Sequence, residues 1–527
     1  MQSMQAPRGG MMVTPHYLAS RAGRDVLREG GNAIEAMVAA AAAVAVAYPH
    51  MNALGGDGFW LLAEPGRPPR AIEACGRAAR RADRHFYAGL DSIPARGPLA
   101  ALTVGGTVDG WQRALAIAAQ WGGRLPLSRL LAPAIEWAER GVAVSRSQAA
   151  LTAAKFDELR EQPGFADHLL IDGAPPSEGA LLRQTRLAET LRQLARRGLG
   201  DFYRGELGAA MGEDLARLGS PLRGADLADY RARKVSPLSV SLKAGRVWNL
   251  PPPTQGVASL MILGILDRLP PAEAEGPAYL HAVVEATKQA FMARDRHVID
   301  PAFMAIDAET LLSAGHLDRM AAAIDSRQPL AWPQPTDAGD TVWLGCIDGE
   351  GRAVSFIQST YWEFGAGIVL PSSGVLWQNR GIGFSLDPQA RQALRPGRLP
   401  FHTLNPALAR LNSGETLVYG TMGGEGQPQT QAAIFSRHAL LGQPLAQAVS
   451  APRWLLGRTW GEQSVTLKLE SRFDPEWLET LAAMGHEIEK VEAFSDLMGH
   501  AGAVARHPDG VLEGAADPRS DGEAAAL

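Results

Sequence analysis

The sequence Asp340-Thr341-Val342-Trp343-Leu344-Gly345-Cys346-Ile347-Asp348 continues through Gly349-Glu350-Gly351-Arg352 into a second apolar run. Strand-forming residues at 342–347 and 353–357 flank an Asp-Gly-Glu-Gly sequence, whose composition is typical of a hairpin turn. The stretch therefore predicts a β-hairpin with Thr341 at the head of its first strand. On spacing alone, this threonine is an ordinary β-branched strand residue.

The composition is that of a globular protein with a sizeable core, since 46% of the 527 residues are hydrophobic and 20% are charged. A net charge of −5 gives no sign of a nucleic-acid footprint or a polybasic membrane patch. Cys75 and Cys346 are the two cysteines, so a disulfide scaffold and paired-cysteine metal sites are excluded. Without an HExxH, EF-hand or P-loop pattern, we expect no metal and no other cofactor.

Residues 36–48 form the longest uncharged apolar run, which is too short for the roughly 20 residues of a membrane span. The run is rich in alanine and predicts a buried helix. Residues 1–16 contain no hydrophobic stretch of secretory length, so we expect a cytoplasmic protein that binds no membrane.

Further elements follow from local pattern. Residues 131–141, 281–294 and 475–484 predict helices, the first ending at a glycine. Residues 325–340 are polar and rich in proline and glycine, which predicts an exposed, mobile segment just before Thr341.

The hairpin also carries a resemblance. Asp340-Thr341 followed by a strand, an Asp-x-x-Gly-x-Ala-Val turn and a serine resembles the start of the small subunit of γ-glutamyltranspeptidases. The resemblance implies an α/β (α+β) protein with the four-layer αββα sandwich of an N-terminal-nucleophile (Ntn) hydrolase. It also implies one composite domain made of a large subunit, residues 1–340, and a small subunit, residues 341–527. Stretches that resemble the same family, in the same order, are 31–33, 54–59, 104–111, 202–205, 251–256 and 513–519.

A threonine hydroxyl needs a base to become a nucleophile, and a free α-amino group titrates near pH 7.7–8.0. The resemblance implies that cleavage of the Asp340–Thr341 bond supplies nucleophile and base together. Ser359 stands where the family has a threonine that hydrogen-bonds the nucleophile's amino group. Gly423 and Gly424 match the family's oxyanion loop. Taken alone, Ser359 is a polar strand residue and the glycine pair is a turn.

The substrate-binding positions depart from the family. Its arginine for the substrate α-carboxylate aligns with Cys75, two residues before Arg77. The acidic residue that pairs with the substrate ammonium is absent from Gln378-Asn379-Arg380, where a cation stands instead. This exchange disfavours an ammonium-bearing substrate and favours a carboxylate held by Arg380 or Arg77. The other positions that we expect to line the substrate site are Tyr361, Trp362, His402 and Thr403, although core packing is the commoner role for aromatic residues such as these.

The pattern is similar to family members that act as amidohydrolases on a small amide bearing a carboxylate. The substrate we expect is oxamate, hydrolysed to oxalate and ammonia in urate or purine degradation. Alternatives are a γ-glutamyl hydrolase or transpeptidase, a glutaryl (cephalosporin-type) acylase, and an uncleaved, non-catalytic relative. The expected partners are a small-molecule substrate and the two fragments of the chain as a heterodimer, or a dimer of such heterodimers, without nucleic acid.

Overall fold

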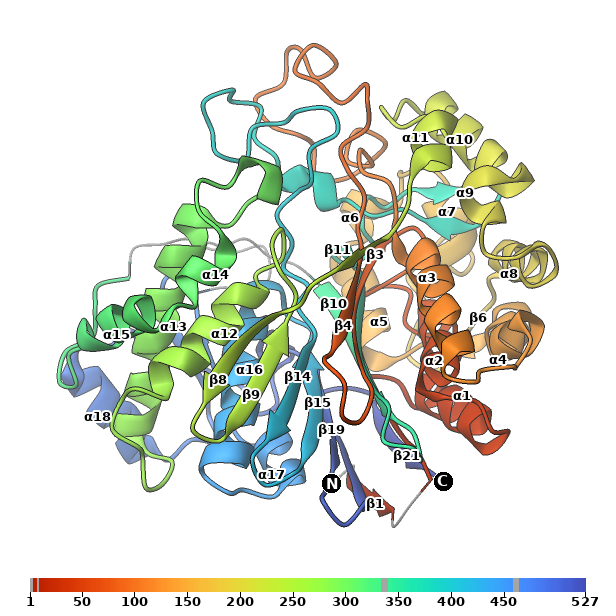
Figure 1. Cartoon of the computed structure of the whole chain (residues 1–527). Coiled ribbons are helices and arrows are strands. Elements are labelled where there is room, and N and C mark those ends of the chain that lie inside the picture. Colours follow the sequence, from red (N-terminus) through yellow and green to blue (C-terminus); the bar gives the residue numbers. More distant parts are fainter. Residues whose placement is uncertain (1–2, 7–8, 333–339, 458–463) are drawn as a thin grey trace.

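The computed structural model describes residues 3–6, 9–332, 340–457 and 464–527. Two seven-stranded antiparallel sheets lie face to face, and helices cover the outer face of each (Figure 1). This arrangement confirms the predicted αββα sandwich. One sheet, the β15 sheet, has the order β1 (Ser3–Ala6), β20 (Leu512–Ala516), β19 (Ala501–Arg506), β15 (Thr416–Thr421), β14 (Ala407–Leu411), β9 (Gly245–Asn249) and β8 (Leu238–Leu242); the other, the β10 sheet, has the order β21 (Glu523–Ala526), β2 (Met11–Thr14), β10 (Asp340–Ile347), β11 (Ala353–Tyr361), β3 (Asp57–Ala63), β4 (Arg70–Ala74) and β7 (Arg233–Val235).

Strands β10 and β11 form the predicted hairpin and lie at the centre of their sheet. Alternate side chains of β10 point to opposite faces, as a strand requires. Val342 and Leu344 pack in the apolar cluster shared with the outer helices, whereas Trp343 and Ile347 pack between the two sheets. Thr341 is therefore the second residue of a strand whose odd-numbered residues face the other sheet.

Glycines let the two sheets approach each other around Trp343. A Cβ on Gly420 would lie 2.2 Å from the indole, and a Cβ on Gly502 would lie 2.6 Å from it, so no side chain fits at either position. The indole Nε1 donates a hydrogen bond to Ser355 Oγ at 2.9 Å. The centre of the sandwich is thus tightly packed immediately beside Thr341.

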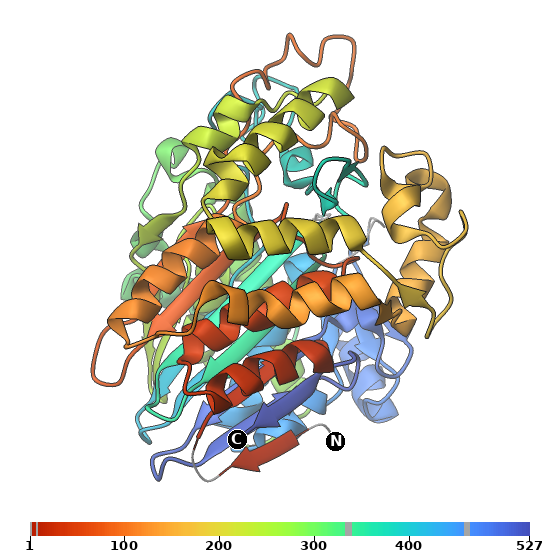
Figure 2. The same cartoon turned by 90° about the vertical axis from the view of Figure 1, so that its right-hand side faces the viewer.

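The central helix over the β10 sheet is α2 (Ala33–Ala47), which is buried at every position, as the alanine-rich run predicts. Its start is a capping box, in which the Asn32 side chain accepts from the backbone of Glu35 and the Glu35 carboxylate accepts from the backbone of Asn32. None of the described helices combines the length and the apolar character needed to cross a membrane. Figure 2 shows this layer, whose other helices are α1 (Tyr17–Arg28), α3 (Thr107–Gln120), α4 (Leu127–Arg140) and α8 (Thr185–Arg197).

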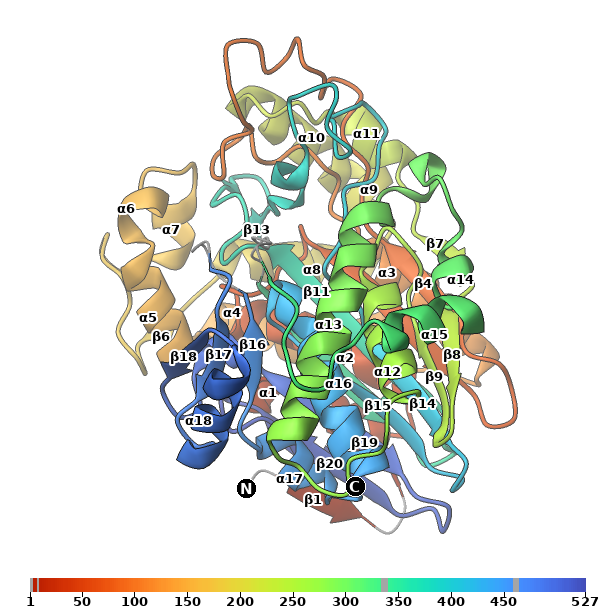
Figure 3. The same ribbon diagram turned by 90° about the vertical axis from the view of Figure 1, so that its left-hand side faces the viewer.

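The β15 sheet is covered by α12 (Gly256–Leu266), α13 (Pro277–His297) and α16 (Gln427–Phe435), which Figure 3 shows. The predicted helices at 281–294 and 475–484 are confirmed as α13 and α18 (Pro475–Met484), and α4 confirms the one at 131–141. The remaining elements are α5 (Arg146–Ala154), α6 (Phe156–Leu159), α7 (Phe165–Leu169), α9 (Asp201–Arg204), α10 (Glu206–Leu218), α11 (Gly224–Asp229), α14 (Ala308–Leu311), α15 (Ala314–Ala322), α17 (Leu445–Ser450), β5 (Val142–Ala143), β6 (Leu181–Leu182), β12 (Val369–Leu370), β13 (Val375–Leu376), β16 (Trp454–Leu456), β17 (Leu467–Glu470) and β18 (Ile488–Val491).

Two smaller predictions concern the junction and the cysteines. Residues 325–328 are exposed, as the composition of 325–340 predicts, while residues 333–339 lie outside the described part of the chain. Cys75 and Cys346 are both buried and free.

Candidate active site

Thr341 lies at an irregularity in the central hairpin. The pairing of β10 with β11 shifts between Asp340 and Val342, so that Thr341 alone faces both Ser359 and Thr360. Such a bulge is frequent next to active sites, because it redirects the side chains around it. Thr341 is 1% exposed. Its side chain is therefore held within the protein.

The Thr341 hydroxyl has a polar neighbour on the other layer of the sandwich. Gln427 is the first residue of α16 and is fully buried, and its Nε2 donates to Thr341 Oγ1 at 3.4 Å. Gly423 and Gly424 lie four and three residues earlier, with φ angles of +110° and +50° that favour glycine. The predicted oxyanion loop is thus joined directly to the side chain that touches Thr341.

The glycine loop is supported from behind by a buried polar network. Gln255 Nε2 donates to the carbonyl of Gly424 at 2.8 Å. Arg294 Nη1 donates to Gln255 Oε1 at 2.9 Å, and the same guanidinium forms an ion pair with Glu425. No acceptor in the described part of the chain takes the N–H groups of Gly423 and Gly424. These N–H groups remain available to an oxyanion, in a loop whose position is set in advance.

Ser359 lies beside Thr341 on β11 and is 2% exposed. Its Oγ accepts the backbone N–H of Tyr361 at 2.8 Å. Tyr361 has a φ of +82°, a conformation that is strained for a bulky residue and that concentrates at functional sites. The hydrogen bond from Ser359 to the amine of Thr341 stays a prediction, because that amine exists only after cleavage.

Arg380, a predicted substrate cation, is only 2% exposed. Its Cζ lies 3.3 Å from the centre of the Tyr361 ring, and its Nη1 lies 3.4 Å from Thr403 Oγ1. Among the described residues, its guanidinium makes no ion pair with a carboxylate and its Nε has no hydrogen-bond acceptor. Buried arginines are almost always paired, so this one is suited to an anion that arrives from outside.

His402 belongs to the same group of side chains and forms a pair with Asp57. His402 Nε2 lies 2.9 Å from Asp57 Oδ2, while Asp57 Oδ1 accepts the N–H groups of Gly76 and Gly106 at 3.3 and 3.0 Å. Burial raises the pKa of Asp57 to about 8. Burial, together with the positive charge of Arg380, holds the pKa of His402 well below its usual value. At neutral pH the carboxyl of Asp57 therefore keeps its proton and donates a hydrogen bond to His402 Nε2. The neutral imidazole then carries its own N–H on Nδ1.

Arg77 and Trp362 have other neighbours. Arg77 is 45% exposed at its side chain, donates to the carbonyl of Gly397 at 2.9 Å and lies 3.8 Å from Asp300. Trp362 is half-buried, with the Arg96 guanidinium 5.6 Å from its ring. The geometry favours Arg380 over Arg77 as the substrate cation, and substrate contacts for Arg77 and Trp362 stay predictions.

Sequence reasoning missed Asp57 and Gln427. Asp57 lies in the glycine-rich stretch 55–58, where Gly56 is packed so closely that a Cβ would lie 2.2 Å from the carbonyl oxygen of Ser359. The signal in the sequence was a carboxylate, Asp57, at the head of an otherwise apolar strand. Burial of an unpaired charge is costly, so such a residue is expected to have a partner in the fold. Gln427 gave no such signal, since a glutamine at a helix start is ordinary.

The chain is similar to known proteins over its whole length. The family model described as Gamma-glutamyltranspeptidase matches residues 19–527. The oxamate amidohydrolase proenzyme of Klebsiella pneumoniae subsp. pneumoniae is 55% identical over 100% of both chains, and the glutathione hydrolase-like YwrD proenzyme of Bacillus subtilis is 39% identical over 98% of both. The crystal structure of cephalosporin acylase from Bacillus halodurans superposes with a TM-score of 0.90 at 34% identity, covering 100% of this chain and 97% of that one.

The matched residues include Thr341 and all the side chains placed around it above. Both curated relatives are proenzymes, which implies that this chain also cuts itself into a large and a small fragment. The chain belongs to the γ-glutamyltranspeptidase family of N-terminal-nucleophile hydrolases.

Proposed function

We propose that the chain cleaves itself between Asp340 and Thr341, and that the freed Thr341 hydrolyses oxamate to oxalate and ammonia. The relative that is 55% identical carries the name oxamate amidohydrolase, and the surroundings of Thr341 suit the same small, carboxylate-bearing amide. One observation carries the substrate assignment: the buried guanidinium of Arg380, stacked on Tyr361, makes no ion pair among the described residues.

Self-cleavage uses the hydroxyl of Thr341. Its oxygen attacks the carbonyl carbon of Asp340, the C–N bond to Thr341 breaks, and the acyl group moves from nitrogen to oxygen. Water then hydrolyses the resulting ester, which leaves a carboxylate on Asp340 and a free amine on Thr341. That amine is a base near neutral pH and lies beside the hydroxyl that it must deprotonate.

Turnover of oxamate repeats this chemistry on a second amide. The amine of Thr341 takes the proton of the hydroxyl, and the oxygen attacks the amide carbon of oxamate. The N–H groups of Gly423 and Gly424 stabilise the oxyanion of the tetrahedral intermediate. The C–N bond breaks and ammonia leaves with the transferred proton. Water attacks the oxalyl ester and releases oxalate, which regenerates the hydroxyl.

Arg380 gives the site its preference for a carboxylate. A bidentate contact from a guanidinium to a carboxylate fixes both the charge and the orientation of a small planar substrate. His402 Nδ1 is buried and has no hydrogen-bond partner among the described residues, so its N–H is a second donor that the substrate carboxylate can use. An ammonium group placed here would face a buried cation, which disfavours a γ-glutamyl substrate.

The likeness to a cephalosporin acylase keeps a second candidate, a longer acyl chain that ends in a carboxylate. Ammonia release from oxamate should be measured beside p-nitroaniline release from γ-glutamyl and glutaryl anilides. The proposal predicts turnover of oxamate at least tenfold above that of either anilide in kcat/KM. Turnover of the anilides alone would overturn the oxamate assignment, and an uncut, inactive chain would support the non-catalytic alternative.

The two fragments should remain together after cleavage. In the β10 sheet, β10 of the small fragment pairs with β2 of the large fragment, and β11 pairs with β3. Strands from the two fragments are therefore interleaved in one hydrogen-bonded sheet. Separation would break backbone ladders and expose the apolar centre of the sandwich, so we propose a stable heterodimer.

A further inference from the structure

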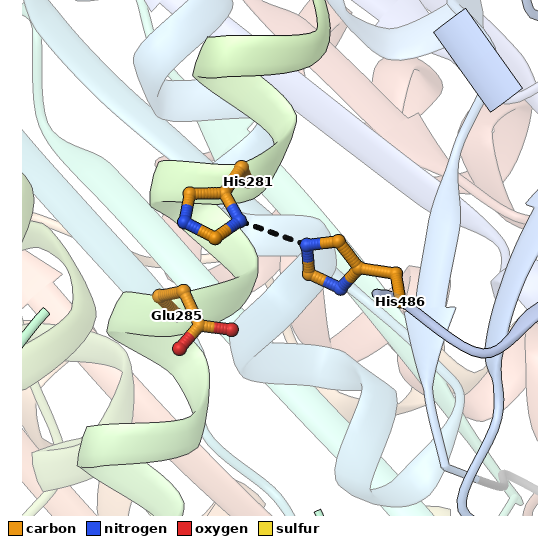
Figure 4. A group of neighbouring side chains, drawn as sticks. All are labelled: His281, Glu285 and His486. Atoms are coloured by element: carbon orange, nitrogen blue, oxygen red, sulfur yellow. Dashed lines mark hydrogen bonds between the residues drawn. The ribbon is translucent and has the colours of Figure 1, made fainter. Parts of the chain in front are cut away.

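Three buried side chains far from Thr341 in sequence converge between α13 and the segment that follows α18 (Figure 4). His281 and Glu285 are one turn apart on the same face of α13. His486 comes directly after Gly485, where α18 ends. Their exposed fractions are 2%, 1% and 7%, and one ligand atom from each lies within 4.8 Å of the other two.

The hydrogen bonds around the cluster orient its ligand atoms. His281 Nε2 lies 2.7 Å from the carbonyl oxygen of Asp325, which places the proton on Nε2 and leaves a lone pair on Nδ1. That Nδ1 faces His486 Nε2 at 2.8 Å. A carbonyl behind a histidine, fixing its tautomer, is the usual arrangement outside the ligands of a metal site.

We propose that His281, Glu285 and His486 bind a divalent transition-metal ion, with Zn²⁺ as the best fit. Two imidazole nitrogens and one carboxylate oxygen are a common zinc donor set, and water completes the tetrahedron. Two nitrogens that share one zinc at 2.0–2.1 Å lie about 3.3 Å apart. The present separation of 2.8 Å must therefore open by about half an ångström, a movement that the loop position of His486 permits.

Lys288 is the charged group that opposes binding. Its Nζ lies 2.8 Å from Glu285 Oε1 and donates to the carbonyl of Leu330 at 2.7 Å. Glu285 Oε2 already accepts the N–H of Leu330 at 2.9 Å, but each carboxylate oxygen has a second lone pair. A cation beside a ligand carboxylate weakens metal affinity by repulsion. Removal of the Lys288 charge should therefore strengthen Zn²⁺ binding. A cluster with only a structural role would show no such effect.

The position of the cluster gives the ion a structural role. His281 and Glu285 precede Thr341, and His486 follows it, so the ion would join the two fragments across the β15 side of the sandwich. Asp325 and Leu330, which the cluster holds through hydrogen bonds, belong to the segment that leads to the cleavage point. Zn²⁺ binding by this cluster does not depend on which substrate the enzyme hydrolyses.

The test is titration of the chelator-stripped full protein with ZnCl₂ against a chromophoric competitor. His486→Gln keeps an N–H for His281 Nδ1 but removes a ligand, and His85→Gln changes an exposed histidine outside the cluster. We expect one tight Zn²⁺ per chain in the wild type and in H85Q, binding at least about 100-fold weaker in H486Q, and binding about tenfold tighter in Lys288→Met.

Thermal unfolding provides an independent readout. Zn²⁺ should raise the Tm of the wild type and of H85Q, and leave the Tm of H486Q unchanged. Equal Zn²⁺ affinity in the wild type and H486Q would overturn the proposal. Zn²⁺ binding by K288M that is no tighter than binding by the wild type would also overturn it. This second comparison does not require H486Q to fold.

Discussion

Asp57 and His402 are 345 residues apart in sequence, yet Asp57 Oδ2 lies 2.9 Å from His402 Nε2 in a fully buried pair. Burial reverses the usual behaviour of the carboxyl, because it raises the pKa of Asp57 to about 8. The pair therefore carries its proton at neutral pH. The nearby positive charge of Arg380 opposes the rise in the pKa of Asp57 and lowers the pKa of His402.

The raised pKa of Asp57 makes stability depend on pH. The folded state holds this proton up to about pH 8, whereas the unfolded state releases it near pH 3.8, so the stabilisation is fully present below pH 3.8 and is lost progressively as the pH rises from there to about 8. In an uncut Thr341→Ala background, urea unfolding should show the parent losing about 2–4 kcal/mol more than Asp57→Asn between pH 5 and pH 8. Parallel pH profiles would contradict the buried, protonated carboxyl.

The role of Arg380 can be separated from that of Arg77. Arg380→Lys keeps a charge but loses the planar contact with Tyr361 and the bidentate grip on a carboxylate. We expect KM for oxamate to rise about tenfold or more in R380K, whereas Arg77→Lys, in an exposed side chain, changes KM by less than about twofold. Initial-rate ammonia assays give both values, and the opposite order would move the carboxylate site to Arg77.

Gln427 should act through the position of the Thr341 hydroxyl. Gln427→Met keeps the length of the side chain and removes the donor to Oγ1. Loss of about 1 kcal/mol in this contact predicts a roughly fivefold lower kcat with little change in KM, together with slower self-cleavage. An increase in KM alone would assign Gln427 to substrate binding instead.

The pairing of small-fragment strands with large-fragment strands in the β10 sheet predicts a complex that survives cleavage. The processed protein should elute as one species in native size-exclusion chromatography and give two bands only on a denaturing gel. Elution of the two fragments as separate species from the native column would show that the sheet does not hold them together.

Local pattern was sufficient where a feature lies within one stretch of sequence. The hairpin around 348–351, the alanine-rich α2 and the bounds of α18 each follow from periodicity, capping or turn residues. Thr341 and Gly423-Gly424 required the resemblance to a family, because a threonine at a strand head and a glycine pair are each common. With it, both were assigned to one site; their catalytic roles stay predictions, and Gln427, three residues after Gly424, contacts the Thr341 hydroxyl.

Pairs formed across the fold could not be predicted from local pattern. His281 and His486 are 205 residues apart, and neither lies in a spacing typical of metal ligands, so only the packing of α13 against α18 brings them together. The choice between Arg380 and Arg77 was open for the same reason. Burial distinguishes them, and burial depends on the whole fold.

The most direct test is the intact mass of the purified protein under denaturing conditions. Cleavage at Asp340–Thr341 predicts two fragments with the masses of residues 1–340 and 341–527, and one unbroken chain for Thr341→Ala. A break at another bond, or full activity in an unbroken wild-type chain, would contradict Thr341 as the nucleophile released by self-cleavage.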